Sequence, residues 1–251
     1  MQNTRTSFSF GENWQDFVES YLTPERVAIA KQYLVEFLEK ANLKGQYFLD
    51  VGCGSGLSSL AAYELGAARI VSFDLDPCAV MATQKLRERA GNPAHWTIRQ
   101  GSILDEQFVN VIEKADIVYS WGVLHHTGQM WNALANTSRL LLDKGLLYIA
   151  LYTTTPKSEY WLRVKQQYNS VSVFRKHVME VGFVLTHSCK LLFFNLKNPI
   201  RHIREYKQNR GMAYWTDVRD WLGGYPYEHA KIEEVLRFAR KQINLELINI
   251  K

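Results

Sequence analysis

The sequence has few of the features that hold a chain together without a hydrophobic core. Its 251 residues include only three cysteines, and Cys53, Cys78 and Cys189 lack the spacing of metal ligands. This odd number argues against a disulfide scaffold and is typical of reduced thiols in a cytoplasmic protein. No repeat or low-complexity segment is present, so the length predicts one large domain, or one domain with a cap.

Long apolar runs are also missing. Residues 1–11 are polar and lack the apolar centre of a signal peptide. The most apolar later stretch, residues 178–196, is interrupted by Glu180, His187 and Lys190. It therefore predicts a buried or cap element rather than a membrane span. We expect a cytoplasmic protein.

Acidic residues are scarce in one stretch of the chain. Residues 157–210 hold 11 lysines and arginines against three glutamates, while the whole chain has a net charge of +5. Two interpretations stay open, a solvated basic face or a surface that meets an anionic partner. Nucleic acid is not favoured as that partner, because the sequence shows no appended recognition module and no arginine-rich tail.

Strand-like and helix-like patterns alternate over most of the chain. Strands are predicted at residues 47–51, 69–74, 96–100, 116–120, 146–152 and 245–250. Helical patterns lie between them, which predicts an α/β fold with a doubly wound, mostly parallel, Rossmann-like sheet. The last strand is mainly apolar on both faces, so we expect it to be covered by a continuation of the chain or by a partner, such as a second copy.

The alternation stops after residue 154. Residues 155–228 are rich in aromatic side chains and show no clear strand, which predicts a helical cap inserted into the fold. We therefore divide the chain into an N-terminal segment and helix (1–44), a core (45–154), the cap (155–228) and the end of the core sheet (229–251).

A glycine-rich turn follows the first predicted strand. Asp50, Gly52, Gly54 and Gly56 lie in the run DVGCGSG, where glycine permits a sharp turn and close contact between a ligand and the backbone. Leu57 stands where the dinucleotide fingerprint needs its third glycine, and no P-loop lysine follows. A carboxylate at position 50 can accept hydrogen bonds from an ammonium group, which NAD and ATP lack.

Asp74 ends the second predicted strand, about twenty residues after the glycine turn. An acidic residue at this place suits the two hydroxyl groups of a ribose. The two features together predict a ligand with an adenosine-like end and an amino-acid-like end.

These motifs resemble those of class I S-adenosylmethionine (SAM)-dependent methyltransferases over roughly residues 45–152. The runs SWGVLHHTG (120–128) and DWLGGYPYE (220–228) resemble the ubiquinone-methylase-like (UbiG-like) group of small-molecule methyltransferases. The resemblance implies SAM as cofactor and assigns the cofactor-binding positions. These are Asp50, Gly52 and Gly54 at the methionine end, Asp74 at the ribose, Leu75, Ser102 and Ile103 around the adenine, and Tyr119 and Trp121 near the sulfonium.

The acceptor side has several candidate residues. His125 and His126 follow the fourth strand and are the candidate catalytic residues, as a base or as orienting groups. Tyr225 and Glu228 are weaker candidates for substrate contact, and the resemblance makes Trp14 a candidate lid residue over the cofactor. No side-chain cluster has metal-ligand spacing, so no catalytic metal is expected.

We therefore expect a methyltransferase that acts on an O, N or C nucleophile of a small-molecule acceptor. The interleaved basic residues are compatible with an acidic or carrier-linked acceptor. The alternative is a SAM-binding interaction or regulatory protein without turnover. A homodimer is a further expectation.

Overall fold

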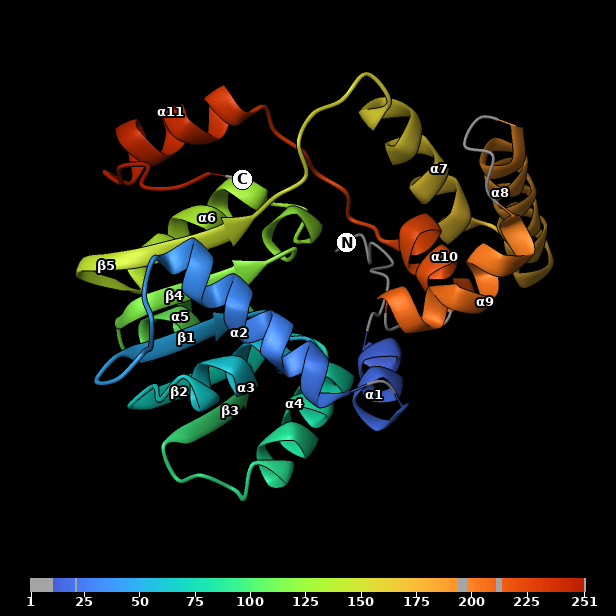
Figure 1. Cartoon of the computed structure of the whole chain (residues 1–251). Helices are drawn as coiled ribbons and strands as arrows, with labels where there is room; N and C mark the ends of the chain where they lie inside the picture. The colour runs from blue at the N-terminus through green and yellow to red at the C-terminus, as the bar shows by residue number, and fades with distance from the viewer. Residues whose placement is uncertain (1–10, 21, 194–197, 211–213, 251) are drawn as a thin grey trace.

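The computed structural model describes residues 11–20, 22–193, 198–210 and 214–250. Its centre is a five-stranded parallel sheet in the order β3-β2-β1-β4-β5, with helices on both faces (Figure 1). The strands are β1 (Tyr47–Val51), β2 (Arg69–Asp74), β3 (Trp96–Gln100), β4 (Ala115–Trp121) and β5 (Leu141–Ala150). The predicted α/β, Rossmann-like fold is confirmed.

The core helices begin where local sequence favours a helix start. Pro24 opens α2 (Pro24–Leu38) and Pro77 opens α4 (Pro77–Arg89), where a missing N–H costs no hydrogen bond. Asp76 caps α4 by accepting from the Cys78 amide at 2.8 Å. The remaining helical elements of the core are α3 (Leu57–Glu64), α5 (Glu106–Asn110), the short η1 (Leu124–His126), α6 (Met130–Arg139) and α11 (Ile232–Gln242).

The N-terminal helix α1 (Gly11–Ser20) packs along α4. Gln15 donates to the Cys78 carbonyl at 3.4 Å, and Arg89 donates to the Val18 carbonyl at 2.7 Å. This packing brings the N-terminal part of the chain to the carboxyl end of the sheet, where Trp14 reaches the glycine turn.

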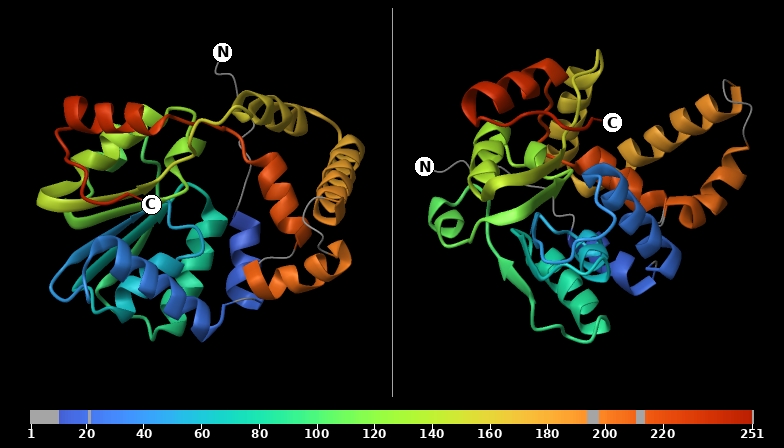
Figure 2. Two further views of the ribbon diagram at one scale, coloured as in Figure 1. Left: turned by 45° about the horizontal axis from the view of Figure 1, so that its top comes forward. Right: turned by 60° about the vertical axis from the view of Figure 1, so that its left-hand side comes forward.

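Residues 155–228 contain four helices in their described parts. They are α7 (Ser158–Ser170), α8 (Val173–Phe193), α9 (Pro199–Arg210) and α10 (Tyr214–Gly223). Figure 2 shows α8 and α9 projecting away from the sheet. No helix within the described ranges combines the length and apolarity needed to cross a membrane.

The strand predicted at residues 245–250 does not form. After α11 this segment is irregular, with the Leu245 amide bonded to the Ala239 carbonyl and the Asn249 side chain to the Phe37 carbonyl. Leu245 packs against the core beside α11. This segment is thus partly buried against the core through Leu245. It does not pair as a strand with the edge strand β5.

Candidate functional site

The sheet order reverses between β1 and β4, which makes this point the crevice where ligands bind in open α/β sheets. The glycine turn follows β1, and the loop with both histidines follows β4. Tertiary structure thus brings together two motifs that lie about seventy residues apart in the sequence.

Backbone hydrogen bonds hold the glycine turn, and neighbouring side chains leave little room for a Cβ at Gly52 or Gly54. The amides of Gly52 and Cys53 both donate to the Phe73 carbonyl, at 2.9 and 3.0 Å. Gly52 has a φ of +75°, and a Cβ there would lie 2.4 Å from Cγ1 of Val123. A Cβ on Gly54 would lie 3.2 Å from the Trp14 indole. The turn is therefore in contact with both the histidine loop and α1.

Asp74 joins β2 to this turn. One carboxylate oxygen accepts from the Gly54 amide at 3.0 Å, and the other accepts from the Asp76 amide at 2.9 Å. Each oxygen has a second lone pair, so the carboxylate can still accept hydroxyl groups. Burial raises the pKa of Asp74, and the two amide bonds oppose that rise.

Asp50 lies deeper than the sequence indicated. Its side chain is 1% exposed and accepts from the Ser59 hydroxyl at 2.5 Å. A buried chain of hydrogen bonds leads to it from the Trp96 indole through the hydroxyls of Ser72 and Ser59. Burial raises the pKa of Asp50 to about 7. Its charge can therefore act on a ligand only through the turn.

The expected adenine side of the crevice carries an exposed apolar side chain. Leu75 is 65% exposed, whereas Ile103 is 5% exposed. The Ser102 hydroxyl accepts from the Leu104 amide at 3.1 Å. Leu75 thus offers an exposed apolar surface on which a ring can pack.

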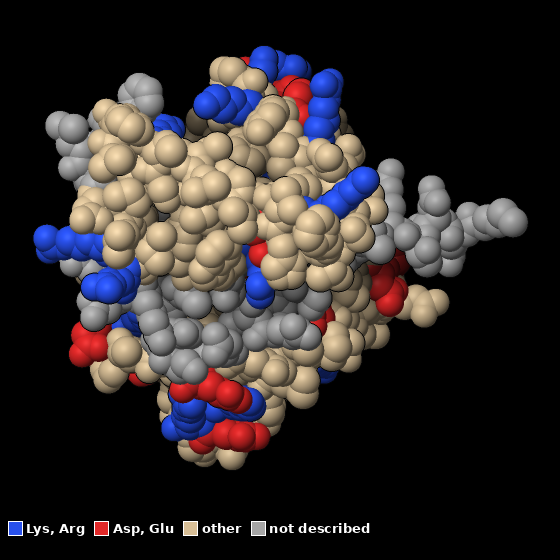
Figure 3. All heavy atoms as spheres, turned by 90° about the vertical axis from the view of Figure 1, so that its right-hand side faces the viewer, with Lys and Arg blue, Asp and Glu red and all other residues tan. Residues whose placement is uncertain are grey.

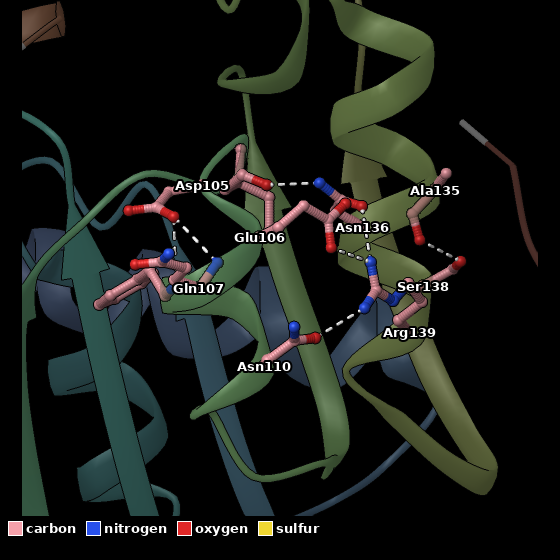
Figure 4. Close-up of polar contacts among 10 residues, drawn as sticks. Asp105, Glu106, Gln107, Asn110, Ala135, Asn136, Ser138 and Arg139 are labelled. Carbon is pink, nitrogen blue, oxygen red and sulfur yellow. Dashed lines mark hydrogen bonds and ion pairs between the residues drawn. The ribbon is translucent and has the colours of Figure 1, made fainter.

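A polar network between α5 and α6 positions the loop that carries Ser102 and Ile103 (Figure 4). Asn136 donates to the Ile103 carbonyl at 2.9 Å. Arg139 donates to Glu106 at 2.6 Å and to Asn110 at 2.7 Å, which ties α6 to α5.

The two residues expected near the sulfonium differ in exposure. Tyr119 is 8% exposed and packs in the core against Phe48 and Tyr148, whereas Trp121 is 57% exposed at the end of β4. Only Trp121 has a largely solvent-accessible side chain.

The adjacent histidines have opposite hydrogen-bonding roles. The Tyr152 amide donates to Nδ1 of His125 at 3.2 Å, so a neutral His125 carries its proton on Nε2. Nδ1 of His126 lies 2.6 Å from the Pro226 carbonyl, which can only accept. A neutral His126 therefore has its proton on Nδ1 and its lone pair on Nε2. Nε2 of His125 is buried and has no partner within the described part of the chain.

Both rings are neutral near pH 7. Burial, together with the nearby His126 and Lys165, lowers the pKa of His125 to about 2. Burial and Lys165 lower the pKa of His126 to about 4, although its bond to the Pro226 carbonyl opposes this shift. A base with so low a pKa removes a proton poorly at neutral pH. His125 and His126 are therefore better suited to orient an acceptor through hydrogen bonds than to act as a general base.

Lys165 was counted among surface charges by its sequence context, yet it is 1% exposed. Its ammonium group donates to the Trp221 carbonyl and lies 4.7 Å from the Trp221 ring and 5.1 Å from the Tyr227 ring. Burial lowers its pKa to about 8. Trp161, Lys165 and Tyr168 share one face of α7, and this spacing was the available signal. Lys165 thus joins α7 to α10 and to the loop that carries Pro226.

Glu228 and Tyr225 stand on that same loop. The Glu228 carboxylate accepts from the Met130 amide at 3.0 Å, at the start of α6, and its own amide donates to the His125 carbonyl at 2.9 Å. These bonds favour a role in holding the histidine loop. Tyr225 is half-buried.

A family of known proteins matches the core. The profile described as ribosomal protein L11 methyltransferase (PrmA) matches residues 31–139, less than half of the chain. The protein of that name from Klebsiella pneumoniae (strain 342) is 29% identical over 150 residues, which cover 54% of this chain and 50% of that protein. Its namesake from Photorhabdus laumondii is 39% identical over 64 residues, covering 26% and 22%. The chain thus spans half or less of these relatives' length.

Solved methyltransferases resemble the chain more weakly. Magnesium protoporphyrin IX methyltransferase from Synechocystis PCC 6803, with bound SAH, is 18% identical with a TM-score of 0.44, covering 63% of this chain and 67% of that chain. An O-methyltransferase family protein from Burkholderia thailandensis is 16% identical with a TM-score of 0.45, covering 57% and 43%.

The fold expected of a class I SAM-dependent methyltransferase is confirmed, and the match of residues 31–139 to a methyltransferase family supports SAM as the cofactor. The ubiquinone-methylase-like subgroup is not confirmed, because the curated relatives bear a different name. The expectation of a small-molecule acceptor is wrong, because those names specify a ribosomal protein as the acceptor. That expectation rested on short motifs outside the cofactor site, which say little about what is methylated.

Proposed function

We propose that this chain transfers the methyl group of SAM to a nucleophile carried by a protein. The observation that carries the proposal is the glycine turn bonded to Asp74 at the point where the sheet order reverses. The match to a protein-methylating family over residues 31–139 supports a protein acceptor. That match ends at residue 139, so it does not cover the helices of residues 155–228.

The residues around the turn fit the cofactor. We assign the backbone of Gly52 and Gly54 to the methionine end, with Asp50 acting through the turn. The Asp74 carboxylate has the lone pairs that two ribose hydroxyls need. Leu75 offers an exposed apolar surface to the adenine, and the loop of Ser102 and Ile103 borders it.

The sulfonium end is assigned to the carboxyl end of β4. We place Tyr119 and Trp121 near the sulfonium of SAM, and Trp14 over the glycine turn as a lid on the cofactor. When bound, SAM supplies an electrophilic methyl group, so the protein has to place the nucleophile in line and exclude water.

The histidines supply the groups that orient the acceptor. The Nε2 proton of His125 can donate to an acceptor oxygen or nitrogen, and Nε2 of His126 can accept from its N–H or O–H. Bound SAM would supply the methyl group as an electrophile, and the two histidines would hold the acceptor with its lone pair toward that group. A proton left on the acceptor would pass to water, because the pKa of His126, about 4, is too low for this ring to keep a proton at neutral pH.

Calorimetry with SAM and with its demethylated product tests the cofactor site. Asp74→Ala should weaken binding by about 1–3 kcal/mol, because a charged partner of the ribose is lost. Asp116→Ala is the matched control, since Asp116 also accepts a backbone amide, from Tyr47 at 2.8 Å, but at the amino ends of the strands, opposite the glycine turn. Equal affinity of Asp74→Ala and the wild type would refute the ribose assignment.

Methyl-labelled SAM tests the acceptor. Incubation with a cell extract should place label in the protein fraction for the wild type and not for Asp74→Ala. Label confined to the small-molecule fraction would contradict a protein acceptor. SAM binding without labelling of either fraction would instead assign the chain to the alternative, a SAM-binding protein without turnover.

A further inference from the structure

Helix α8 presents an apolar stripe to solvent. Its inner face buries Glu180 and Leu191 against the cap. On the opposite side, six residues follow one another at intervals of three or four and share one helix face. They are Phe174, Val178, Val181, Leu185, Cys189 and Leu192, and all six are exposed.

The stripe is long and carries no charge. Phe174 is 77% exposed and Leu185 is 60% exposed. At a rise of about 1.5 Å per residue the stripe runs for about 27 Å. Of the three Lys and Arg residues of the helix, Arg175 lies about 100° around the axis from Phe174, and Lys190 and Lys176 lie about 160° and 200° from it. An outer helix face normally carries polar side chains, so an apolar one marks an interaction surface.

The surroundings of the stripe are basic. Residues 157–210 contain 11 lysines and arginines, of which Lys165 is buried, and three glutamates. One of the glutamates, Glu180, is buried, where it accepts from the Tyr168 hydroxyl at 2.6 Å and pairs with Arg219 at 3.5 Å. Viewed from the cap side, the molecule shows a broad area of residues other than Lys, Arg, Asp and Glu, with charged residues of both signs around it (Figure 3).

We propose that α8 docks on a membrane surface that contains anionic lipids. The stripe would lie at the boundary of headgroups and acyl chains, and the flanking basic side chains would meet lipid phosphates. Because α8 and α9 project away from the sheet (Figure 2), a surface can reach the stripe without meeting the core. This docking does not depend on methyl transfer.

The composition of the surface favours a membrane over two other occupants. A protein partner is usually held through Tyr, Trp and Arg with directional hydrogen bonds. The stripe instead consists of aliphatic side chains, one phenylalanine and one thiol. A second copy would set two strongly basic segments against each other, and like charges oppose such pairing.

Vesicle co-sedimentation tests the proposal. The full chain should bind vesicles of phosphatidylcholine with phosphatidylglycerol about tenfold more strongly than vesicles of phosphatidylcholine alone, and about 0.5 M salt should release it. The double variant Val181→Glu/Leu185→Glu should lower partitioning into the anionic vesicles by about tenfold or more. Both positions are exposed, at 48% and 60%, so the thermal unfolding midpoint should not change.

The control is Val111→Glu, which puts the same charge on another exposed valine, at 65%, directly after α5. It should bind vesicles as the wild type does. Equal binding of the wild type and the double variant would overturn the proposal, as would no preference for the anionic vesicles. A dimer in light scattering that the double variant abolishes, without vesicle binding, would assign the stripe to a second copy and overturn it too.

Discussion

The core sheet and the cap bury their side chains in different ways. The core has two large apolar clusters, one on each face of the sheet, and all five residues of β1 are buried. In the described part of the cap, the buried apolar cluster has four members, Tyr168, Tyr214, Val218 and Leu222. The cap also buries the charged side chains of Lys165 and Glu180. The difference indicates a rigid frame for the cofactor and a polar, less densely packed unit on the acceptor side.

Matched leucine truncations should give the largest contrast. Leu49 in β1 is 0% exposed, so Leu49→Ala should cost about 3–4 kcal/mol of unfolding free energy through lost burial and a cavity. Leu185 in α8 is 60% exposed, so Leu185→Ala should change it by about 0.5 kcal/mol or less. Urea unfolding measures both. Similar losses would mean that α8 is covered in solution.

Gly52→Ala tests the contact between the glycine turn and the histidine loop. We expect a loss of about 3 kcal/mol, from the positive φ and from the clash with Val123. Adding Val123→Ala should recover about 1–2 kcal/mol, because only the clash is relieved. Thermal unfolding of the single and double variants measures this recovery, and its absence would show that backbone strain alone explains the loss.

Asp50→Asn should stabilise the core. Burial raises the pKa of Asp50 from 3.8 to about 7 in the folded chain. Between these values the folded chain holds a proton that the unfolded chain has released, so this group's contribution to stability falls as the pH rises from about 4 to about 7. The variant should be more stable than the wild type at pH 8 by on the order of 2 kcal/mol, with little difference near pH 4.

Urea unfolding at the two pH values measures this, with the exposed Asp143→Asn as control. A variant no more stable than the wild type at pH 8 would mean that Asp50 is already relieved of its burial cost. Weaker SAM binding by the stabilised variant would show that the charge is kept for the cofactor.

The smallest expected effect is in the cap. A double-mutant cycle of Tyr168→Phe and Glu180→Gln should give a coupling free energy of about 1–2 kcal/mol, because the Tyr168 hydroxyl donates to a buried carboxylate at 2.6 Å. In the single variants, hydrogen exchange should show faster exchange of the amides of α7 and α8, whereas the amides of β1 should stay protected. Equal loosening of β1 would mean that the cap and the core unfold as one unit.

Much of the core could be predicted from the sequence, because its signals are local. Three strands, β1, β2 and β3, match their predicted ranges, since each is a short run with β-branched or aromatic residues bounded by turn residues. Thr23-Pro24 and Asp76-Pro77 marked helix starts through capping chemistry. The glycine turn and Asp74 predicted the cofactor, because a ligand that contacts the backbone requires particular residue types at particular spacings.

The acceptor side depended on contacts between distant residues. The hydrogen bonds that give His125 and His126 opposite proton positions come from Tyr152 and Pro226, the latter a hundred residues away. Lys165 looks like a surface lysine until α7 packs against Trp221 and Tyr227. Burial sets the pKa of such groups, and burial belongs to the folded chain as a whole.

The sequence by itself determined the α/β alternation, the cofactor turn and the basic character of residues 157–210, because each is a matter of residue type and short spacing. Tertiary structure alone decided that residues 245–250 do not pair with the sheet, that Asp50 is buried away from the crevice, and that one face of α8 stays exposed. Those outcomes depend on which surfaces meet, and apolar periodicity records only that a surface is apolar.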